Sequence, residues 1–270
     1  MQPTEEYLYR YIGLDSFVNM VQNQALHFVL PSMWEDPAET FAYEELLGRQ
    51  SDPLMIALLA AIKHKIYAHC WTLLSESDEM WRIYSYGNRA LRIRIKAENI
   101  ALLPDIQRID VIYEDDVEKA FASVDKENEW QVAWAIKRSA FSHEQEVRLI
   151  QWYRFEDEDD MKEHIKMWLA IHREEWEERT RIIQSFDNDI DKAVDAMIDK
   201  LNAADKVKTK AIPFHHIPDF IAGVMVHPLA PQWYVETVRQ YCADHNITFD
   251  GQSTLYKKPE HKIFAQVKKK

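Results

Sequence analysis

The sequence predicts an α+β protein built as one domain, with strands and helices mixed along the chain. Short runs of aromatic and β-branched residues, such as those at 7–11 and 25–30, have the length of strands. Other segments repeat apolar residues at helical spacing, as at 54–62. With 270 residues, 47% of them apolar, the chain is long enough to bury one large core. We therefore treat residues 1–270 as a single domain.

The first elements are defined by their apolar spacing and by the residues that bound them. The aromatic run at 7–11 predicts a strand, and apolar residues at helical spacing after Asp15 predict a short helix to Val21. A second strand at 25–30 ends at a proline. The segment that follows, 31–39, is interrupted twice by proline and is predicted to be a loop.

The middle of the chain continues the alternation of strands and helices. Asp52 and Pro53 suit the first positions of a helix. Further strands are expected at 67–74, 90–95, 106–113 and 146–153. The strand at 90–95 alternates apolar and cationic residues, as half-exposed strands do. A short helix at 79–84 and an acidic helix after residue 113 are expected between these strands.

The composition changes at 156–205, which is dense in charge and carries no strand signal. Its apolar residues share helical faces, so we expect a charged helical hairpin inserted into the domain. Residues 211–258 return to the α/β core, with a strand at 221–226, a helix at 231–245 and a last strand near Ile247.

The composition also excludes several classes of function. Only 5 glycines occur and no common glycine-rich phosphate motif is present, so side chains would have to hold any nucleotide. A formal charge of −12 argues against a broad basic surface for nucleic-acid backbones. Two distant cysteines predict neither a disulfide framework nor a zinc site. A signal-peptide layout and a membrane-length apolar run are both absent, so we expect a cytoplasmic protein with no membrane partner.

Three segments carry residues suited to chemistry, and the first is the opening strand. Tyr9 and Arg10 lie in this otherwise apolar run. A buried guanidinium needs a carboxylate or phosphate partner, which suits a nucleotide site. The alternative is an edge-strand arginine whose head group reaches solvent.

The second segment, at 69–88, places the hydroxyl of Thr72 before a helix with a thioether and two aromatic groups. These groups belong to Met80, Trp81 and Tyr84. They suit the enclosure of a flat heterocycle. The alternative is that they form the core face of the helix.

The third segment, at 143–148, places Glu144 and Glu146 on one face of the predicted strand. Arg148 offsets their repulsion only in part, so the crowding is expected to raise one pKa. A carboxylate in such a site stabilises a developing oxocarbenium ion in sugar chemistry. The alternative is a solvated charged face on an edge strand.

The order of these segments resembles the bacterial domain-of-unknown-function family 2971. The opening at 8–39, LYRYIGLDSFVNMVQNQALHFVLPSMWEDPAE, is similar to that family's aromatic strand, short helix, second strand and NDP.E loop. Later blocks of the family also have counterparts here: its M-W-x-x-Y matches 80–84, its E-x-E-x-R matches 144–148, and its closing I-x-x-G-P-x-A is similar to 221–230. Its C-F-S block corresponds to 70–72, which departs from the pattern by reading C-W-T. The loop departs from the pattern because Glu35 replaces its asparagine.

The same order is similar to that of DarT-type ADP-ribosyltransferases, which modify DNA. This resemblance implies a split mixed or antiparallel sheet core with flanking helices and a helical insertion. It implies that Glu146 holds the nicotinamide ribose of NAD and favours glycosidic cleavage, while Glu144 orients or deprotonates the acceptor. The residues implied to bind NAD are Tyr9, Arg10, Asp36, Thr72, Ser75, Met80, Trp81 and Tyr84. Arg10 would contact the phosphates or ribose of NAD.

The predicted function is that of an NAD-dependent mono-ADP-ribosyltransferase, a bacterial toxin or phage-defence effector that an antitoxin could bind. Its acceptor would be a nucleic-acid base or a protein. Cations near the site in sequence favour nucleic acid, namely Arg89, Arg92, Arg94, Lys96, Lys137 and Arg138. The alternatives are a non-enzymatic module that binds a nucleotide or a partner, and an NAD glycohydrolase. No metal is expected, because His215, His216 and His227 lack acidic or cysteine neighbours at ligand spacing.

Overall fold

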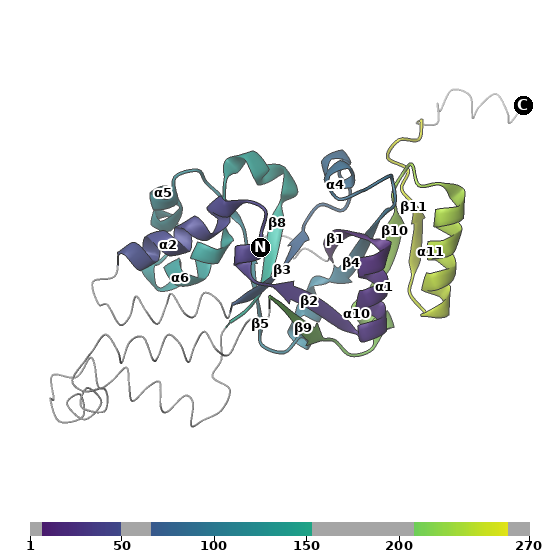
Figure 1. Ribbon diagram of the computed structural model, residues 1–270, viewed down its shortest axis with the longest axis horizontal. Helices are drawn as coiled ribbons and strands as arrows, with labels where there is room; N and C mark the ends of the chain where they lie inside the picture. Colours follow the sequence, from purple (N-terminus) through teal and green to yellow (C-terminus); the bar gives the residue numbers. More distant parts are fainter. Residues whose placement is uncertain (1–6, 50–65, 153–207, 259–270) are drawn as a thin grey trace, which may run out of the picture.

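The computed structural model describes residues 7–49, 66–152 and 208–258, which form an α+β protein. Its nine-stranded, mostly antiparallel sheet carries helices on both faces (Figure 1). The predicted insertion at 156–205 and the predicted helix that starts near Asp52 lie outside the described residues. Within them, no helix is long and apolar enough to cross a bilayer.

The first described segment follows the predicted order of elements. It contains β1 (Tyr7–Gly13), α1 (Leu14–Asn23), β2 (Ala25–Val29), the 3-10 turns η1 (Pro31–Met33) and η2 (Pro37–Thr40), and α2 (Phe41–Gly48). Gln24 ends α1 in a left-handed conformation, with φ 47°, and its amide donates to the carbonyls of Met20 and Val21. This turn brings the chain directly into β2.

The second described segment carries the chemistry-bearing motifs. Its elements are β3 (Tyr67–Thr72), α4 (Asp78–Ile83), β4 (Ala90–Lys96), η4 (Ala97–Leu102), β5 (Ile106–Asp110), β6 (Ile112–Tyr113), α5 (Val117–Ala122), η5 (Lys126–Asn128), α6 (Glu129–Val132), η6 (Ala133–Ala135), β7 (Ile136–Lys137), η7 (Ser139–Glu144) and β8 (Glu146–Gln151). The single strand predicted at 106–113 is wrong, because the chain leaves the large sheet at Val111. Its amide donates to the carbonyl of Glu146, and β6 then pairs with β7 in a separate two-stranded sheet.

The last described segment returns to the sheet, as predicted. It contains β9 (Thr209–Pro213), α10 (Ile217–Phe220), β10 (Gly223–Val226), α11 (Gln232–Asp244) and β11 (Phe249–Gln252). The strand predicted from residue 221 begins two residues later, because α10 runs to Phe220 and the amide of Ile221 still bonds back to Ile217. Figure 1 shows α11 at one end of the sheet and α2, α5 and α6 gathered at the other.

The sheet branches at β3. The strand order is β11-β10-β4-β1-β3-β2-β9, and β8 and β5 continue the sheet from β3. β3 pairs with β8 along six residues, from Tyr67 to Thr72. By contrast, it meets β1 only at the Tyr9–Thr72 pair and β2 only at the Val29–Ala68 pair. The sheet therefore opens between β1 and β3 just beyond the Tyr9–Thr72 pair.

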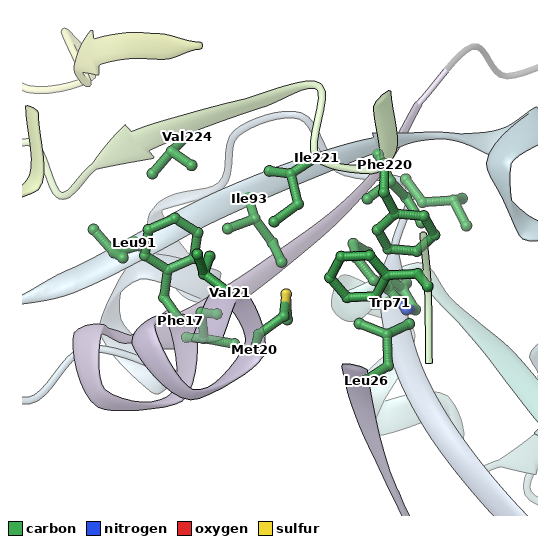
Figure 2. Close-up of a cluster of buried hydrophobic side chains, with 14 of the residues drawn as sticks. Phe17, Met20, Val21, Leu26, Trp71, Leu91, Ile93, Phe220, Ile221 and Val224 are labelled. Carbon is green, nitrogen blue, oxygen red and sulfur yellow. The ribbon is translucent and has the colours of Figure 1, made fainter. Parts of the chain in front are cut away.

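Alternation along β8 divides the two faces of the sheet. Val147 and Leu149 are fully buried in the main core, where α1, α10 and α11 pack against β4. Figure 2 shows part of this core, in which side chains of α1, β4 and α10 lie near Trp71. Ile150 lies on the other face, in a smaller cluster with α2, α5 and α6. Glu146 and Arg148 share that second face by the same alternation.

A close approach at Gly223 generates a prediction about stability. Asp250 on β11 pairs with Arg94 on β4 at 2.8 Å, and this ion pair passes over Gly223 on the strand between them. A Cβ at position 223 would lie 2.6 Å from the Asp250 carboxylate and 2.7 Å from Arg94 Nε. We expect Gly223→Ala to lower the free energy of unfolding by about 1–3 kcal/mol, because the ion pair must move.

The matched control is Gly48→Ala at the end of α2, where an added Cβ meets nothing within 4 Å. Alanine is favoured over glycine in a helix by up to about 1 kcal/mol, so this variant should be unchanged or more stable. Urea unfolding of both variants measures the difference. Equal effects of the two substitutions would show that the contact at Gly223 does not constrain the fold.

Candidate functional site

A cavity of about 910 Å³ is lined by residues of β1, β3 and β8. Its walls come from β1, from the loop that holds η1 and η2, from α4 and from η7. Three neighbouring strands contribute one row of residues to it, because Tyr9 pairs with Thr72 and Thr72 pairs with Glu146. The cavity therefore lies where β1, β3 and β8 meet and the sheet opens.

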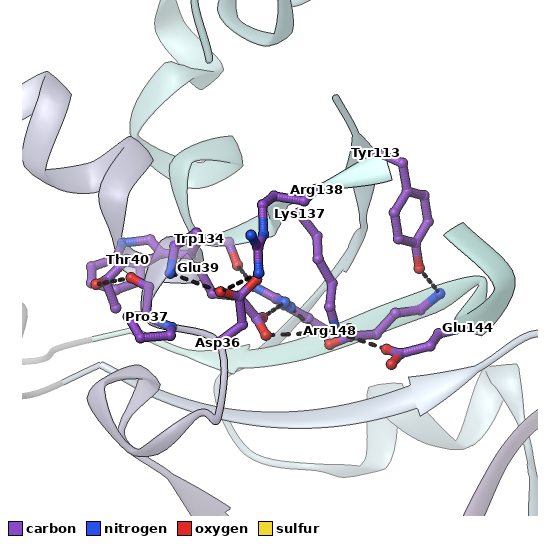
Figure 3. A network of polar contacts seen from close by, with 12 residues as sticks. Asp36, Pro37, Glu39, Thr40, Tyr113, Trp134, Lys137, Arg138, Glu144 and Arg148 are labelled. Carbon is purple, nitrogen blue, oxygen red and sulfur yellow. Dashed lines mark hydrogen bonds and ion pairs between the residues drawn. The ribbon is translucent and has the colours of Figure 1, made fainter. Parts of the chain in front are cut away.

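Glu146 is held from every side at the start of β8. Its Oε1 accepts from Arg148 Nε at 2.9 Å, and its Oε2 accepts from Lys137 Nζ at 2.8 Å. Its backbone amide donates to the hydroxyl of Tyr113 at 2.7 Å. Figure 3 shows Tyr113, Lys137 and Arg148 converging on this point. Its carboxylate is thus fixed in one orientation at the edge of the cavity.

Two further carboxylates complete a buried charge cluster. Lys137 Nζ lies 2.7 Å from Glu144 Oε2 and 3.6 Å from Glu39 Oε1. Arg148 donates to Glu39 and to the carbonyl of Trp134, the latter at 2.7 Å. We define the charge cluster as Glu39, Lys137, Glu144, Glu146 and Arg148, all of which are buried.

The charge cluster sets the ionisation of its members. Burial raises the pKa of Glu146, but Arg148 and Lys137 outweigh burial and bring it down to about 2. Burial raises the pKa of Glu39 above its ordinary value, because the same two cations compensate for it only in part. A raised pKa was expected within the pair Glu144 and Glu146, and for Glu146 this expectation is wrong because its pKa is lowered. The raised carboxyl pKa belongs to Glu39, which lies outside that pair.

Arg10 takes a different position from the cations of the cluster. It donates to the carbonyl of Cys70, on the stretch of β3 from which β1 has diverged. Burial lowers its pKa, with Cys70, Tyr84 and Glu146 opposing this change, and the guanidinium stays charged at neutral pH. Among the described residues that line the cavity, Arg10 is a cation without an ion pair, whereas Lys137 and Arg138 each have one.

The structure brings most of the residues expected at the site to the cavity wall. Those that line it are Tyr9, Arg10, Asp36, Thr72, Met80, Tyr84, Glu144 and Glu146. Thr72 has a structural contact as well, because its hydroxyl donates to the carbonyl of Glu144 at 2.5 Å. Asp36 caps η2, and its carboxylate accepts hydrogen bonds from Nε and Nη2 of Arg138 at 3.1 and 3.0 Å. These contacts fix the loop that carries Glu39.

Two residues expected at the site lie away from it. Trp81 is fully buried behind the wall, where its ring packs edge-on against Tyr11 at 4.7 Å and donates to Glu76. The alternative interpretation of this helix, as a core face, therefore holds for Trp81. Ser75 is exposed on the loop before α4, and its carbonyl accepts from Arg92.

The strand predicted to carry both glutamates also needs correction. Glu144 ends η7, and Gln145 then takes a left-handed conformation with φ 41° before β8 begins. The two carboxylates converge through Lys137, so they do not share a strand face.

The local cations that favoured nucleic acid are also largely used within the protein. Lys137 belongs to the charge cluster, and Arg138 pairs with Asp36. Arg92 and Arg94 both pair with Asp250. The sequence therefore overstates the positive charge available around the cavity.

The sequence did not predict the contacts that join Glu39, Lys137 and Arg148 in the charge cluster. Glu39 lies in the proline-rich loop, and Arg148 was expected only to offset two glutamates in part. Trp34 covers the Arg148 guanidinium at 3.9 Å from its ring centroid. A lysine directly after the apolar run at 132–136 was the available signal for Lys137, since such a position is usually buried.

Metal chemistry finds no support in the part of the chain that the structure describes. No group of three or more metal-binding side chains occurs within these ranges. His227 packs against Trp81, with ring centroids 5.3 Å apart, and its Nδ1 accepts from the amide of Leu229. Burial lowers the pKa of His227, which keeps the ring neutral in this contact.

Comparison with known proteins adds no relative to this description. No protein-family model matches the chain, and no curated protein matches it. The family assignment from the motifs therefore stays a prediction, and the functional argument rests on the geometry of the cavity.

The ionisation of Glu146 generates a prediction about pH. Its folded pKa of about 2 lies below the ordinary value of 4.5, so its stabilising effect is complete above about pH 4.5. The effect is lost as the pH falls toward 2. We expect the stability gap between wild type and Glu146→Gln to narrow by about 3 kcal/mol over this window. Urea unfolding at a series of pH values measures the gap.

Glu39→Gln is the control for the sign of this effect. The folded pKa of Glu39 is raised, so its contribution is complete below the ordinary value and declines as the pH rises through the folded pKa. The gap between wild type and this variant should therefore not narrow on acidification. Parallel curves for the two variants would contradict the assignment of ionised Glu146.

Proposed function

We propose that this chain is an NAD-dependent mono-ADP-ribosyltransferase and that the cavity beside Glu146 is its NAD site. The observation that carries the proposal is the ionised Glu146, fixed at the cavity edge in the strand row that also contains Tyr9 and Thr72. A preoriented carboxylate stabilises positive charge that develops on a sugar during substitution.

The branched sheet supports this proposal. ADP-ribosyltransferase-like folds were expected to have a split sheet, and here β1 and β3 diverge immediately after one residue pair. The divergence opens the cavity beside Glu146 and leaves the Cys70 carbonyl to Arg10. A cavity of about 910 Å³ also lies at the upper end of the range for small-molecule sites, about 300–1,000 Å³, which suits a dinucleotide.

In the proposed reaction, Glu146 and Glu144 have different roles. The bond between C1′ of the ribose and the nicotinamide nitrogen breaks, and its electron pair leaves with nicotinamide. Glu146 stabilises the positive charge on the ribose. A nucleophilic atom of the acceptor then bonds to C1′, and Glu144 accepts its proton. Arg10 is suited to the NAD phosphates, because it is charged and has no carboxylate partner among the described residues.

The acceptor in this proposal is a nucleic-acid base or a protein side chain, as for a toxin or phage-defence effector. The pairing of Arg92, Arg94, Lys137 and Arg138 weakens the charge argument for nucleic acid. If water is the acceptor, the same chemistry is that of an NAD glycohydrolase.

One observation favours a second candidate, a nucleotide-binding module without catalysis. Both carboxylate oxygens of Glu146 already accept hydrogen bonds from Arg148 and Lys137. A carboxylate has about four lone-pair sites, so a ribose hydroxyl can still bind, but the cluster also satisfies itself without a ligand. Turnover of NAD separates this candidate from the transferase.

One prediction of the proposed function concerns nicotinamide release from labelled NAD. Glu146→Gln should reduce release by roughly 10²–10³-fold, because the charge that stabilises the ribose cation is lost. Cell protein and cell nucleic acid are supplied as separate acceptors, and label in one pool identifies the acceptor class. Glu236→Gln on α11 is the matched control, since Glu236 lies outside the cavity lining. Release that is equal in wild type and Glu146→Gln would exclude the proposed chemistry.

The second prediction concerns NAD affinity. Arg10→Met should weaken binding roughly 10–100-fold, since a hydrogen bond to a charged group contributes about 1.5–3 kcal/mol. Arg239→Met on α11 is the control, because this exposed arginine lies outside the cavity. Isothermal titration calorimetry measures both dissociation constants. An unchanged constant for a folded Arg10→Met protein would place the phosphates elsewhere.

A further inference from the structure

Lys137 reaches the site from a strand of only two residues. β7 pairs in parallel with β6, so that Lys137 lies opposite Tyr113. Both side chains point to the same target, because Tyr113 accepts the amide of Glu146 and Lys137 donates to its carboxylate. The small sheet thus delivers two contacts to one residue of the large sheet (Figure 3).

Three acidic side chains surround the Lys137 ammonium, each from a different element. Glu144 comes from the end of η7 at 2.7 Å, Glu146 from β8 at 2.8 Å, and Glu39 from η2 at 3.6 Å. The Lys137 side chain is 8% exposed, so water screens these contacts little. Phe141 lies beside it, with its ring centroid 5.0 Å from Nζ.

The two proposed catalytic carboxylates depend on Lys137 to different extents. Glu146 also bonds to Arg148, and so does Glu39. Glu144 pairs with no other cation among the described residues. Loss of the ammonium therefore leaves Glu146 with a cation but leaves Glu144 with none.

We propose that Lys137 is a positioning residue that holds the Glu144 carboxylate turned toward Glu146, and so serves transfer to the acceptor more than release of nicotinamide. This inference rests on the proposed function, because it assigns the two steps to the two glutamates. Lys137 does not itself act as the nucleophile. The neighbouring carboxylates raise its pKa against the opposing effect of burial, so its ammonium keeps its proton.

The charged and titratable groups that surround Lys137, Glu144 and Glu146 come from several elements. They are Arg10 on β1, Glu39 on η2, Cys70 on β3, Tyr84 after α4, Tyr113 on β6 and Arg148 on β8. None of these groups bonds to the Glu144 carboxylate, which accepts a hydrogen bond from Lys137 Nζ. A change in the ratio of transfer to release on removal of Lys137 therefore reports the Lys137–Glu144 contact.

The test compares Lys137→Met and Lys137→Arg by two rates, nicotinamide release and ADP-ribose transfer to the acceptor pool. We expect Lys137→Met to lower the ratio of transfer to release about tenfold or more near neutral pH, because one charged contact is lost. Lys137→Arg should restore most of this ratio, because it keeps the positive charge. Lys119→Met, at an exposed lysine on α5, is the matched control.

A second comparison asks whether Lys137 acts through Glu144. In a Glu144→Gln background, Lys137→Met should cause no further fall in the ratio of transfer to release. An additive fall, or an unchanged ratio of transfer to release in the folded Lys137→Met protein, would overturn the inference. If Lys137→Met does not fold, the ratio in Lys137→Arg is compared with that of wild type, and a large change in this charge-conserving variant overturns the inference.

A third measurement separates this inference from the proposed function. The carboxyl-carbon resonance of Glu146, assigned by its loss in Glu146→Gln, should titrate at higher pH in Lys137→Met, because one of its two cations is gone. Absence of nicotinamide release in wild type defeats the proposed function alone if this shift is present. Absence of the shift shows that the Lys137 ammonium does not lie between the Glu144 and Glu146 carboxylates, which defeats the role of Lys137 whatever the activity.

Discussion

The burial of Lys137 and Arg148 among carboxylates is the constraint on which the site depends. Moving an unpaired ion into a protein interior costs several kcal/mol, so each buried charge requires partners with good geometry. Here the partners come from η2, η7 and β8, and η2 lies far from the other two elements in the sequence. The loop with η1 and η2, and the turn before β8, are therefore held in place by charge as much as by apolar contact.

The sequence predicts the parts of this structure that depend on local spacing. Alternation in β4 and β8 gives correct strands, and the segments at 14–23 and 232–244 form helices where apolar spacing places them. Eight of the ten residues expected at the site line one cavity, because their motifs sit at the ends of strands that meet at the branch. Local pattern thus locates the cavity without describing its interior.

What the sequence could not supply depends on contacts between distant segments. A two-residue strand such as β7 is too short to show a period, so Lys137 was interpreted as one of the cations available to a nucleic-acid acceptor. The divergence of β1 from β3 is a property of register between strands about 60 residues apart, which no local window contains. Trp81 was expected in the pocket wall but lies in the core. Residues of a core face and of a pocket wall have the same helical spacing, so the sequence does not distinguish the two.

The ion pair between Asp250 and β4 has a consequence for the order in which the chain folds. Arg94 and Asp250 are 156 residues apart in sequence, and Arg92 depends on the same carboxylate. During synthesis, Arg92 and Arg94 on β4 therefore have no Asp250 carboxylate to pair with until nearly the whole described chain has emerged from the ribosome. Strand β4 also supports β1, which carries Tyr9 and Arg10. A nascent chain shorter than 250 residues thus lacks this support for the strand that carries Tyr9 and Arg10, and assembly of the cavity requires that residue 250 has been synthesised.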